Sequence, residues 1–170
     1  MVTVFVSAGT PADDVQEKFL SVVINAIELA GLTPRLMSRR DWNFINPLRG
    51  IYRVMEECCG VVVVAYARYR ITSGEELRRD GAKGLRDVAF PTAWNQIEAA
   101  MAYQKQMPLL VIAQKGLQAD AVLESTGDTR PFWTQIDEDI RLDEGFIGYL
   151  NVLVRFTPPC DRMCREADLA

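Results

Sequence analysis

The chain has 170 residues, a length that fits one domain, and its 49% hydrophobic and 25% charged residues are typical of a folded globular protein. Its net charge of -4 disfavours a protein that neutralises the phosphates of duplex nucleic acid. The sequence contains no histidine, which excludes a Ser–His–Asp triad, a Cys–His pair, an HExxH zinc site and any histidine general base. Chemistry near neutral pH therefore falls to carboxylate, lysine, tyrosine or cysteine side chains.

The four cysteines, Cys58, Cys59, Cys160 and Cys164, have neither the spacing of a zinc site nor the density of a secreted disulfide scaffold. We interpret them as buried or free thiols and expect a cytoplasmic protein without a metal site. The N-terminus lacks the basic and long apolar regions of a signal peptide. No apolar run approaches the ~18–20 residues of a membrane-spanning helix. We therefore expect no membrane partner.

The first half of the chain alternates short apolar runs with amphipathic stretches. In chain order, it predicts a strand over Val2–Ser7, a helix from Thr10 to Gly31, a strand over Thr33–Met37, a helix from Asn46 to Gly60 and a strand over Val61–Tyr66. We expect Thr10 to cap the first helix, because its hydroxyl precedes Pro11 and two aspartates. The Val61–Tyr66 run has no polar alternation, which is typical of a central parallel strand covered on both faces.

The second half opens with a long, charge-mixed stretch over residues 67–90, which contains Gly74, Gly81 and Gly84. Because loops of this length are usually functional or disordered, we interpret it as a mobile flap over a site, with a floppy insertion as an equal alternative. The elements after it are a helix over Ala93–Gln106, strands over Pro108–Ala113 and Phe132–Asp137, and a helix over Phe146–Phe156. We expect one domain over residues 1–156 and a loose tail over 157–170.

This alternation predicts an α/β fold in which helices sandwich a five-stranded parallel sheet, with strand order 2-1-3-4-5 as the simplest right-handed arrangement. In such a sheet, a ligand binds beyond the carboxyl ends of the strands, at the switch between the first and third strands. This rule brings together Ser7–Thr10, Tyr66–Arg70 and the start of the helix at Thr92.

Pro91-Thr92 is expected to cap the helix that follows. This helix begins with a cluster of polar and aromatic side chains: Thr92, Trp94, Asn95 and Glu98. Trp94 and Glu98 are four residues apart and therefore lie on one helix face. A carboxylate beside a tryptophan can be partly desolvated, which raises its pKa and makes it usable as an acid or a base. A solvated glutamate is the simpler interpretation for a generic helix, but the predicted place of this helix at the ligand crevice favours a functional one.

The turn after the first predicted strand is a second candidate for ligand contact. Ser7, Gly9 and Thr10 form a backbone-rich turn before a helix, and such a turn can bind an anion. It is neither a P-loop motif nor a GxGxxG turn. Trp42, in a polar loop, is either a stacking wall of the site or a local hydrophobic plug.

Parts of the sequence resemble two known families. The strand Val4–Ser7, the helix that ends at Ala30-Gly31 and a glutamate near a helix start resemble the TIR-domain pattern. The run from Thr92 to Tyr103, followed by Pro108–Ile112, resembles the nucleoside 2-deoxyribosyltransferase pattern. The same run is similar to one in a prokaryotic group of unassigned function. The likeness covers residues 2–115.

The resemblance implies a flavodoxin-like three-layer core and a glutamate that acts on N-glycosidic bonds, and Glu98 takes that position. Cleavage at C1′ of a nucleoside passes through an oxocarbenium-like state, which a carboxylate stabilises or attacks. Trp94 or Tyr66 would then stack on the base or sugar. The loop arginines on the ligand side are candidates for phosphate contacts or ordinary surface residues: Arg39, Arg40 and Arg68.

We therefore expect an enzyme that cleaves or transfers the N-glycosidic bond of an NAD- or nucleoside-type substrate, without a cofactor. The alternative is a nucleotide-sensing or self-assembling module without turnover, acting as a homo-oligomer or with a larger defence or signalling partner. Glu98 favours the enzyme. The missing Asp-Gly-Thr lead-in before the helix and the long 67–90 stretch favour the module. A domain that binds no ligand is the third interpretation.

Overall fold

The computed structural model describes residues 2–42, 44–124, 130–137 and 144–156. In chain order, its elements are β1 (Val2–Ala8), α1 (Asp14–Leu29), β2 (Leu32–Arg35), α2 (Pro47–Glu56), β3 (Gly60–Ala65), β4 (Tyr69–Arg78), β5 (Gly81–Phe90), α3 (Ala93–Gln104), β6 (Leu109–Gln114), the short 3-10 helix η1 (Ala121–Leu123), β7 (Phe132–Thr134) and α4 (Glu144–Phe156). The expected tail over residues 157–170, with Cys160 and Cys164, lies outside the described residues.

Five strands form one parallel sheet, in the order β2-β1-β3-β6-β7. The α/β fold with a five-stranded parallel sheet is therefore confirmed. The numbering along the sheet differs from the predicted one because β4 and β5, which were not predicted as strands, lie between β3 and α3 in the chain and form a separate sheet. The strands that were predicted as buried runs occupy the centre of the five-stranded sheet.

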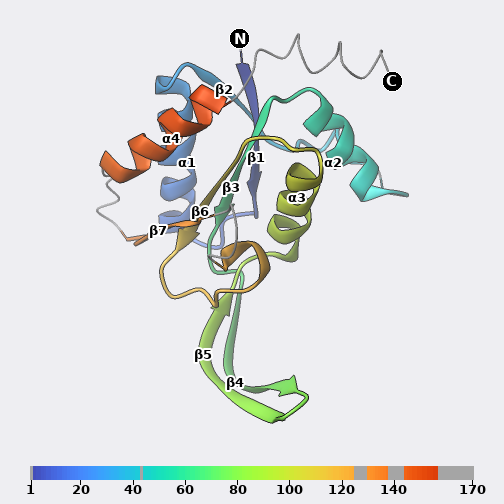
Figure 1. The fold of residues 1–170 in the computed structure, drawn as a ribbon, viewed down its shortest axis with the longest axis vertical. Helices are drawn as coiled ribbons and strands as arrows, with labels where there is room; N and C mark the ends of the chain where they lie inside the picture. The colour runs from blue at the N-terminus through green and yellow to red at the C-terminus, as the bar shows by residue number, and fades with distance from the viewer. Residues whose placement is uncertain (1, 43, 125–129, 138–143, 157–170) are drawn as a thin grey trace.

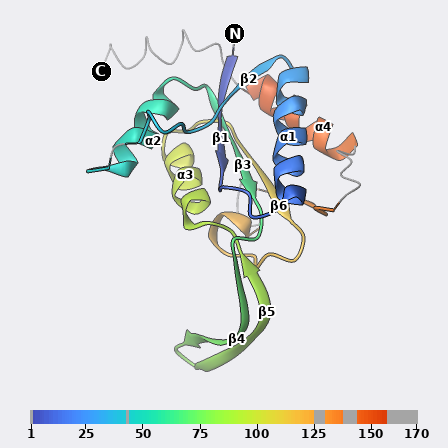
Figure 2. The ribbon, with the colours of Figure 1, turned by 180° about the vertical axis from the view of Figure 1, so that it is seen from behind.

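Helices cover both faces of this sheet (Figures 1 and 2). One apolar cluster joins α2 and α3 to alternate residues of the central strand β3, Val61 and Val63. A second cluster joins α1 and α4 to the intervening residues, Val62 and Val64. Successive side chains of a strand point to opposite faces, so a strand between two helical layers needs apolar residues at every position. This requirement explains the uninterrupted valine run, in which every residue is buried.

The N-cap of α1 differs from the predicted one, whereas the N-cap of α3 does not. Asp13, and not Thr10, caps α1: its Oδ1 accepts a hydrogen bond from the backbone N–H of Gln16 at 2.8 Å. Thr10 is therefore free to line a cavity, as described below. Thr92 caps α3 as predicted, with its Oγ1 3.3 Å from the backbone nitrogen of Trp94.

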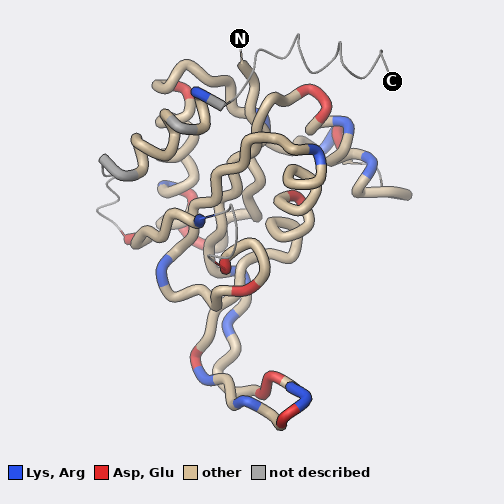
Figure 3. Tube along the Cα trace, viewed as in Figure 1, with Lys and Arg blue, Asp and Glu red and all other residues tan. Residues whose placement is uncertain are grey.

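Residues 69–90 form an ordered antiparallel hairpin, the β4–β5 arm. The arm leaves the domain near the carboxyl ends of β1 and β3 and points away from it (Figures 1 and 2). The expectation of a long loop without secondary structure is therefore wrong, and the arm extends away from the domain. The turn between the strands is Arg79-Asp80, and Gly81, the first residue of β5, has a φ of +126° that favours glycine. Acidic and basic residues are interspersed along the exposed arm (Figure 3).

The base of the arm is fixed to the domain by backbone hydrogen bonds. The nitrogen of Arg68 donates to the carbonyl of Phe90, and the nitrogen of Gln118 donates to the carbonyl of Ala89, both at 2.8 Å. These bonds hold the base of the arm in place beside the end of β3.

The interpretation of the cysteines as thiols holds for Cys58 and is wrong for Cys59. Cys58 is a buried free thiol, and burial raises its pKa to about 12. Cys59 is disulfide-bonded. In the part of the chain that is described, no helix has the length and apolar character needed to cross a membrane.

Candidate functional site

A cavity of about 330 Å³ opens at the carboxyl ends of β1 and β3, where the topology predicts a ligand. Its walls come from β1 and the turn after it, the end of β2 with the following loop, the base of the arm, and the first two turns of α3. The predicted site residues that line it are Gly9, Thr10, Trp42, Arg68, Thr92, Trp94 and Glu98. The fold thus brings most of the predicted residues to one cavity.

Glu98 is the buried carboxylate of this cavity. It is 7% exposed, and burial raises its pKa to about 7, while a hydrogen bond from the Ser7 side chain opposes the increase. A carboxyl group in this environment is partly ionised near neutral pH. It can therefore act as a base, a nucleophile or an acid under physiological conditions.

Ser7 and Asn95 lie behind Glu98 and do not line the cavity. Both are buried, and the side-chain amide of Asn95 donates to the carbonyl and the hydroxyl oxygen of Ser7 at 3.1 and 3.0 Å. Because the Ser7 hydroxyl accepts from Asn95, its own proton is available to the Glu98 carboxylate. The predicted substrate contacts at these two positions are corrected: Ser7 and Asn95 support Glu98 from inside the protein.

Tyr66 also has a different place from the one predicted. Its ring is 2% exposed, and its hydroxyl donates to the carbonyl of Gly9. Burial raises its pKa to about 12. The ring therefore has no exposed face on which a base could stack. Tyr66 instead fixes the turn after β1, where a Cβ atom on Gly9 would lie 3.3 Å from Cγ2 of Thr92.

The two tryptophans of the site lie in contact. The ring centroids of Trp42 and Trp94 are 5.8 Å apart with an interplanar angle of 80°, an edge-to-face arrangement. Trp42 is 39% exposed and Trp94 is 36% exposed. Both rings line the cavity, so Trp42 is a wall of the cavity as well as a partner of Trp94.

A group of hydrogen bonds that sequence reasoning missed fixes the loop before Trp42. The Arg35 guanidinium binds both carboxylate oxygens of Asp41, at 2.7 and 3.0 Å. Asp41 also accepts from the backbone nitrogen and the hydroxyl of Ser38, both at 2.6 Å, and these partners hold its pKa well below its usual range. The three-residue spacing of Ser38 and Asp41 is a turn signal that could have found this contact.

Two side-chain amides, the buried Gln16 and the partly buried Gln114, fix the opposite rim. Gln16 accepts from the nitrogen of Ala12 at 2.9 Å and donates to the carbonyl of Ala67 at 3.0 Å. Gln114 accepts from the nitrogen of Ala67 at 2.8 Å. Ala67 is thereby held on both sides, next to Arg68. The only sequence signal for these hydrogen bonds was the position of Gln16 on the apolar side of a helix.

Of the three arginines that were candidates for phosphate contacts, only Arg68 lines the cavity. Its Nη1 lies 3.4 Å from the carbonyl oxygen of Thr10. Arg39 and Arg40 are exposed and are not part of the cavity wall. The positive end of the site therefore consists of one guanidinium beside the turn after β1.

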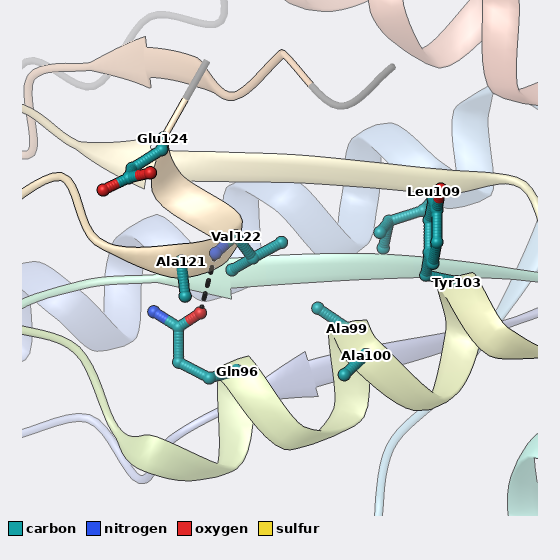
Figure 4. Close-up of a pocket in the computed structure, with 8 residues that line it drawn as sticks. All are labelled: Gln96, Ala99, Ala100, Tyr103, Leu109, Ala121, Val122 and Glu124. Atoms are coloured by element: carbon teal, nitrogen blue, oxygen red, sulfur yellow. Dashed lines mark hydrogen bonds between the residues drawn. The ribbon is translucent and has the colours of Figure 1, made fainter. Parts of the chain in front are cut away.

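A second cavity, of about 270 Å³, lies between α3 and η1 (Figure 4). Figure 4 shows Gln96 pointing from α3 toward η1, where its Oε1 accepts from the nitrogen of Val122 at 3.0 Å. The wall is mostly alanine, valine and leucine, and Glu124 and Tyr103 are its titratable members. Glu124 is exposed, whereas Glu98 in the first cavity is buried, so the first cavity is the better candidate for chemistry.

Within the described ranges, no three Cys, Asp or Glu side chains are grouped so that they could hold a metal ion. A comparison of the chain with protein-family models gives no match, and a comparison with curated proteins gives none either. The geometry of the first cavity is therefore the basis for the function proposed below.

Proposed function

We propose that this protein cleaves or transfers the N-glycosidic bond of a nucleotide or nucleoside, with Glu98 as the group that acts at C1′. The observation that carries the proposal is the buried Glu98 carboxylate, with its pKa raised to about 7, on the wall of a cavity that also presents two tryptophan rings. Trp42 and Trp94 offer apolar surface to a base or sugar. Arg68 and the turn at Thr10 offer positive charge and backbone to a phosphate.

In the proposed reaction the bond between C1′ and the base nitrogen breaks, and its electron pair stays on that nitrogen. Positive charge then develops on C1′ and the ring oxygen of the sugar. The Glu98 carboxylate stabilises this charge or forms a bond with C1′. Water, or an acceptor hydroxyl in a transfer reaction, finally forms a bond with C1′, which breaks any bond between C1′ and Glu98 and frees the carboxylate, and loses a proton to Glu98 or to solvent. Atoms and charge balance without a cofactor.

The titratable groups of the cavity wall favour one class of leaving group. Among the described residues these groups are Arg68, Tyr69 and Glu98, so the wall has a single carboxylate. A base that carries a positive charge while bound, as in an N-ribosyl pyridinium, leaves as a neutral molecule and needs no proton. A neutral purine base is a poor leaving group without a proton from a second acid. An NAD-type substrate is therefore the better match to this wall.

The resemblance to TIR domains and nucleoside 2-deoxyribosyltransferases is consistent with this proposal and remains part of it. We propose that the sheet and its helices form a flavodoxin-like three-layer core of that group. The resemblance supports the proposal at one point: it implies a reacting glutamate near a helix start, and Glu98 lies on the first turns of α3.

A direct assay tests the proposal. The protein is incubated with NAD and with a panel of nucleosides at low and high protein concentration, and the products are separated to detect free base. Release of base that is lost in Glu98→Gln supports the proposal. Absence of base release at every protein concentration contradicts it.

A nucleotide-binding module without turnover is the second candidate. The observation that favours it is the small exposed fraction of Glu98, 7%, which leaves little of the carboxylate open to a substrate. Binding of NAD or a nucleotide without release of base, measured by calorimetry on the same samples, would select this alternative.

A further inference from the structure

One surface outside the cavity exposes several large apolar side chains. Phe44 is 94% exposed and Ile45 is 97% exposed, in the segment that leads into α2. Leu48 and Tyr52 on α2 are 47% and 45% exposed. Leu48 and Tyr52 are four residues apart on α2 and therefore lie on one side of the helix, while Phe44 and Ile45 precede its N-cap, Asn46. We call these four residues the α2 patch.

The surroundings of the α2 patch are basic, although the chain as a whole has a net charge of -4. Arg49 and Arg53 are exposed on α2 together with the patch, and Arg39 and Arg40 are exposed a few residues before it in the chain. Within the described part of the chain, none of them takes part in an ion pair. Figure 3 shows basic residues along α2.

The acidic residues near the patch do not neutralise these arginines. Asp41 and Glu57 pair with Arg35, and Glu56 pairs with Lys105. The positive charge around the α2 patch is therefore available to an external partner. Several exposed apolar side chains of this size, close together in the chain, mark an interaction surface more often than a random part of the exterior.

We propose that the α2 patch binds the surface of an anionic lipid bilayer. An apolar projection flanked by arginines is the arrangement that inserts at the headgroup boundary, where apolar side chains enter the acyl region and cations meet anionic headgroups. Tyr52 has the amphipathic character that is enriched at such an interface. The expectation of no membrane partner rested on the lack of a spanning segment, which does not bear on binding at the surface.

A bilayer fits this surface better than an acidic protein does. Phe44 and Ile45 are almost completely exposed, so they project from the chain and do not line a groove. A protein partner would need a pocket shaped to receive both side chains, whereas lipid chains adapt to any projection. Binding would place the loop that carries Trp42, and with it one wall of the cavity, next to the membrane.

The test is cosedimentation of the full chain with vesicles. Two compositions are compared, phosphatidylcholine alone and phosphatidylcholine with phosphatidylglycerol, at physiological salt and at about 0.5 M salt. We expect the protein to pellet with the anionic vesicles only and to be released by salt. Phe44→Ser/Ile45→Ser is expected to abolish pelleting, and Arg49→Gln/Arg53→Gln to weaken it by about fivefold for each arginine removed.

Two variants serve as matched controls, and a melting curve for each variant shows that it folds. Leu29→Ser removes an apolar side chain that is 89% exposed on α1, and Arg86→Gln removes an exposed charge from the arm. Both are expected to bind like the parent chain. Failure of the parent to pellet with anionic vesicles overturns the proposal, as does pelleting that the patch variants do not change. Either result would leave an acidic protein as the partner to seek.

Discussion

Asn95, on the first turn of α3, donates its side-chain amide to both the carbonyl and the hydroxyl of Ser7 at the end of β1, at 3.1 and 3.0 Å. The two residues are 88 positions apart in the chain. The contact joins the helix that carries Glu98 to the central sheet and fixes the direction of the Ser7 hydroxyl. That hydroxyl is the hydrogen-bond partner of Glu98, so a buried amide helps to set the ionisation of the carboxylate.

Glu98→Gln is expected to abolish the release of base. The amide cannot carry the negative charge that an oxocarbenium-like state requires, and a loss of about a hundredfold or more in rate is typical when such a group is removed. Affinity for a nucleotide should change little, because the tryptophan surfaces and Arg68 are unaltered. Product chromatography and calorimetry on both forms measure the two effects. An unchanged rate in the variant would exclude Glu98 as the reacting group.

The same substitution should make the protein more stable at alkaline pH. The pKa of Glu98 rises from 4.5 to about 7 on folding, so the stability it contributes is complete below about pH 4.5 and is lost as pH rises through 7. Glutamine has no such loss. The free energy of unfolding of Glu98→Gln should therefore exceed that of the parent by up to about 3 kcal/mol at about pH 8.

Urea unfolding of both proteins between about pH 5 and pH 8 measures this difference. Other titrating groups are the same in the two chains, so their effects cancel in the comparison. A difference that does not increase with pH would contradict the raised pKa.

Ser7→Ala should raise the pKa of Glu98 further, because the hydrogen bond from Ser7 is the interaction that lowers it. Activity that depends on the ionised carboxylate would then rise at a higher pH than in the parent chain. The pH profile of base release measures this shift, and the pH dependence of the unfolding free energy measures it without requiring turnover. Ser21→Ala, an exposed serine on α1, is the control. If neither pH dependence shifts in Ser7→Ala, Ser7 does not lower the pKa of Glu98.

Asp41→Asn should loosen the loop that carries Trp42. The variant loses the ion pair between Arg35 and Asp41, whose side chains are 29% and 16% exposed, respectively. It also weakens the hydrogen bonds from Ser38. We expect a loss of about 1–2 kcal/mol in stability and weaker binding of a nucleotide, because Trp42 no longer has a fixed place beside Trp94.

Calorimetry for ligand affinity and tryptophan fluorescence for the Trp42 environment test this prediction. Glu76→Gln is the matched control, since it breaks an ion pair with Arg78 on the arm, away from the cavity wall. Affinity equal to that of the parent in Asp41→Asn would show that the loop does not depend on this ion pair.

Much of the fold could be predicted because its signals are local. The valine run of β3 indicated a strand between two layers, and the same reasoning applied to β6. The arm could not be predicted in the same way, because its strands are exposed on both faces and have no apolar alternation. Its one local signal was Gly81, which directly follows the turn residues Arg79 and Asp80 and has a φ that favours glycine.

The sequence by itself determined that Glu98 lies on the first turns of a helix capped by Thr92, and that this helix starts at the carboxyl edge of a parallel sheet. Spacing along one helix and the direction of parallel strands are sufficient for that. The tertiary structure decided which side chains are buried. It buried Ser7 and Asn95 outside the cavity wall, buried Tyr66 with its hydroxyl on the carbonyl of Gly9, and brought only Arg68 of the three candidate arginines to the cavity. These outcomes depend on contacts between residues far apart in the chain, and no local pattern encodes the packing that creates them.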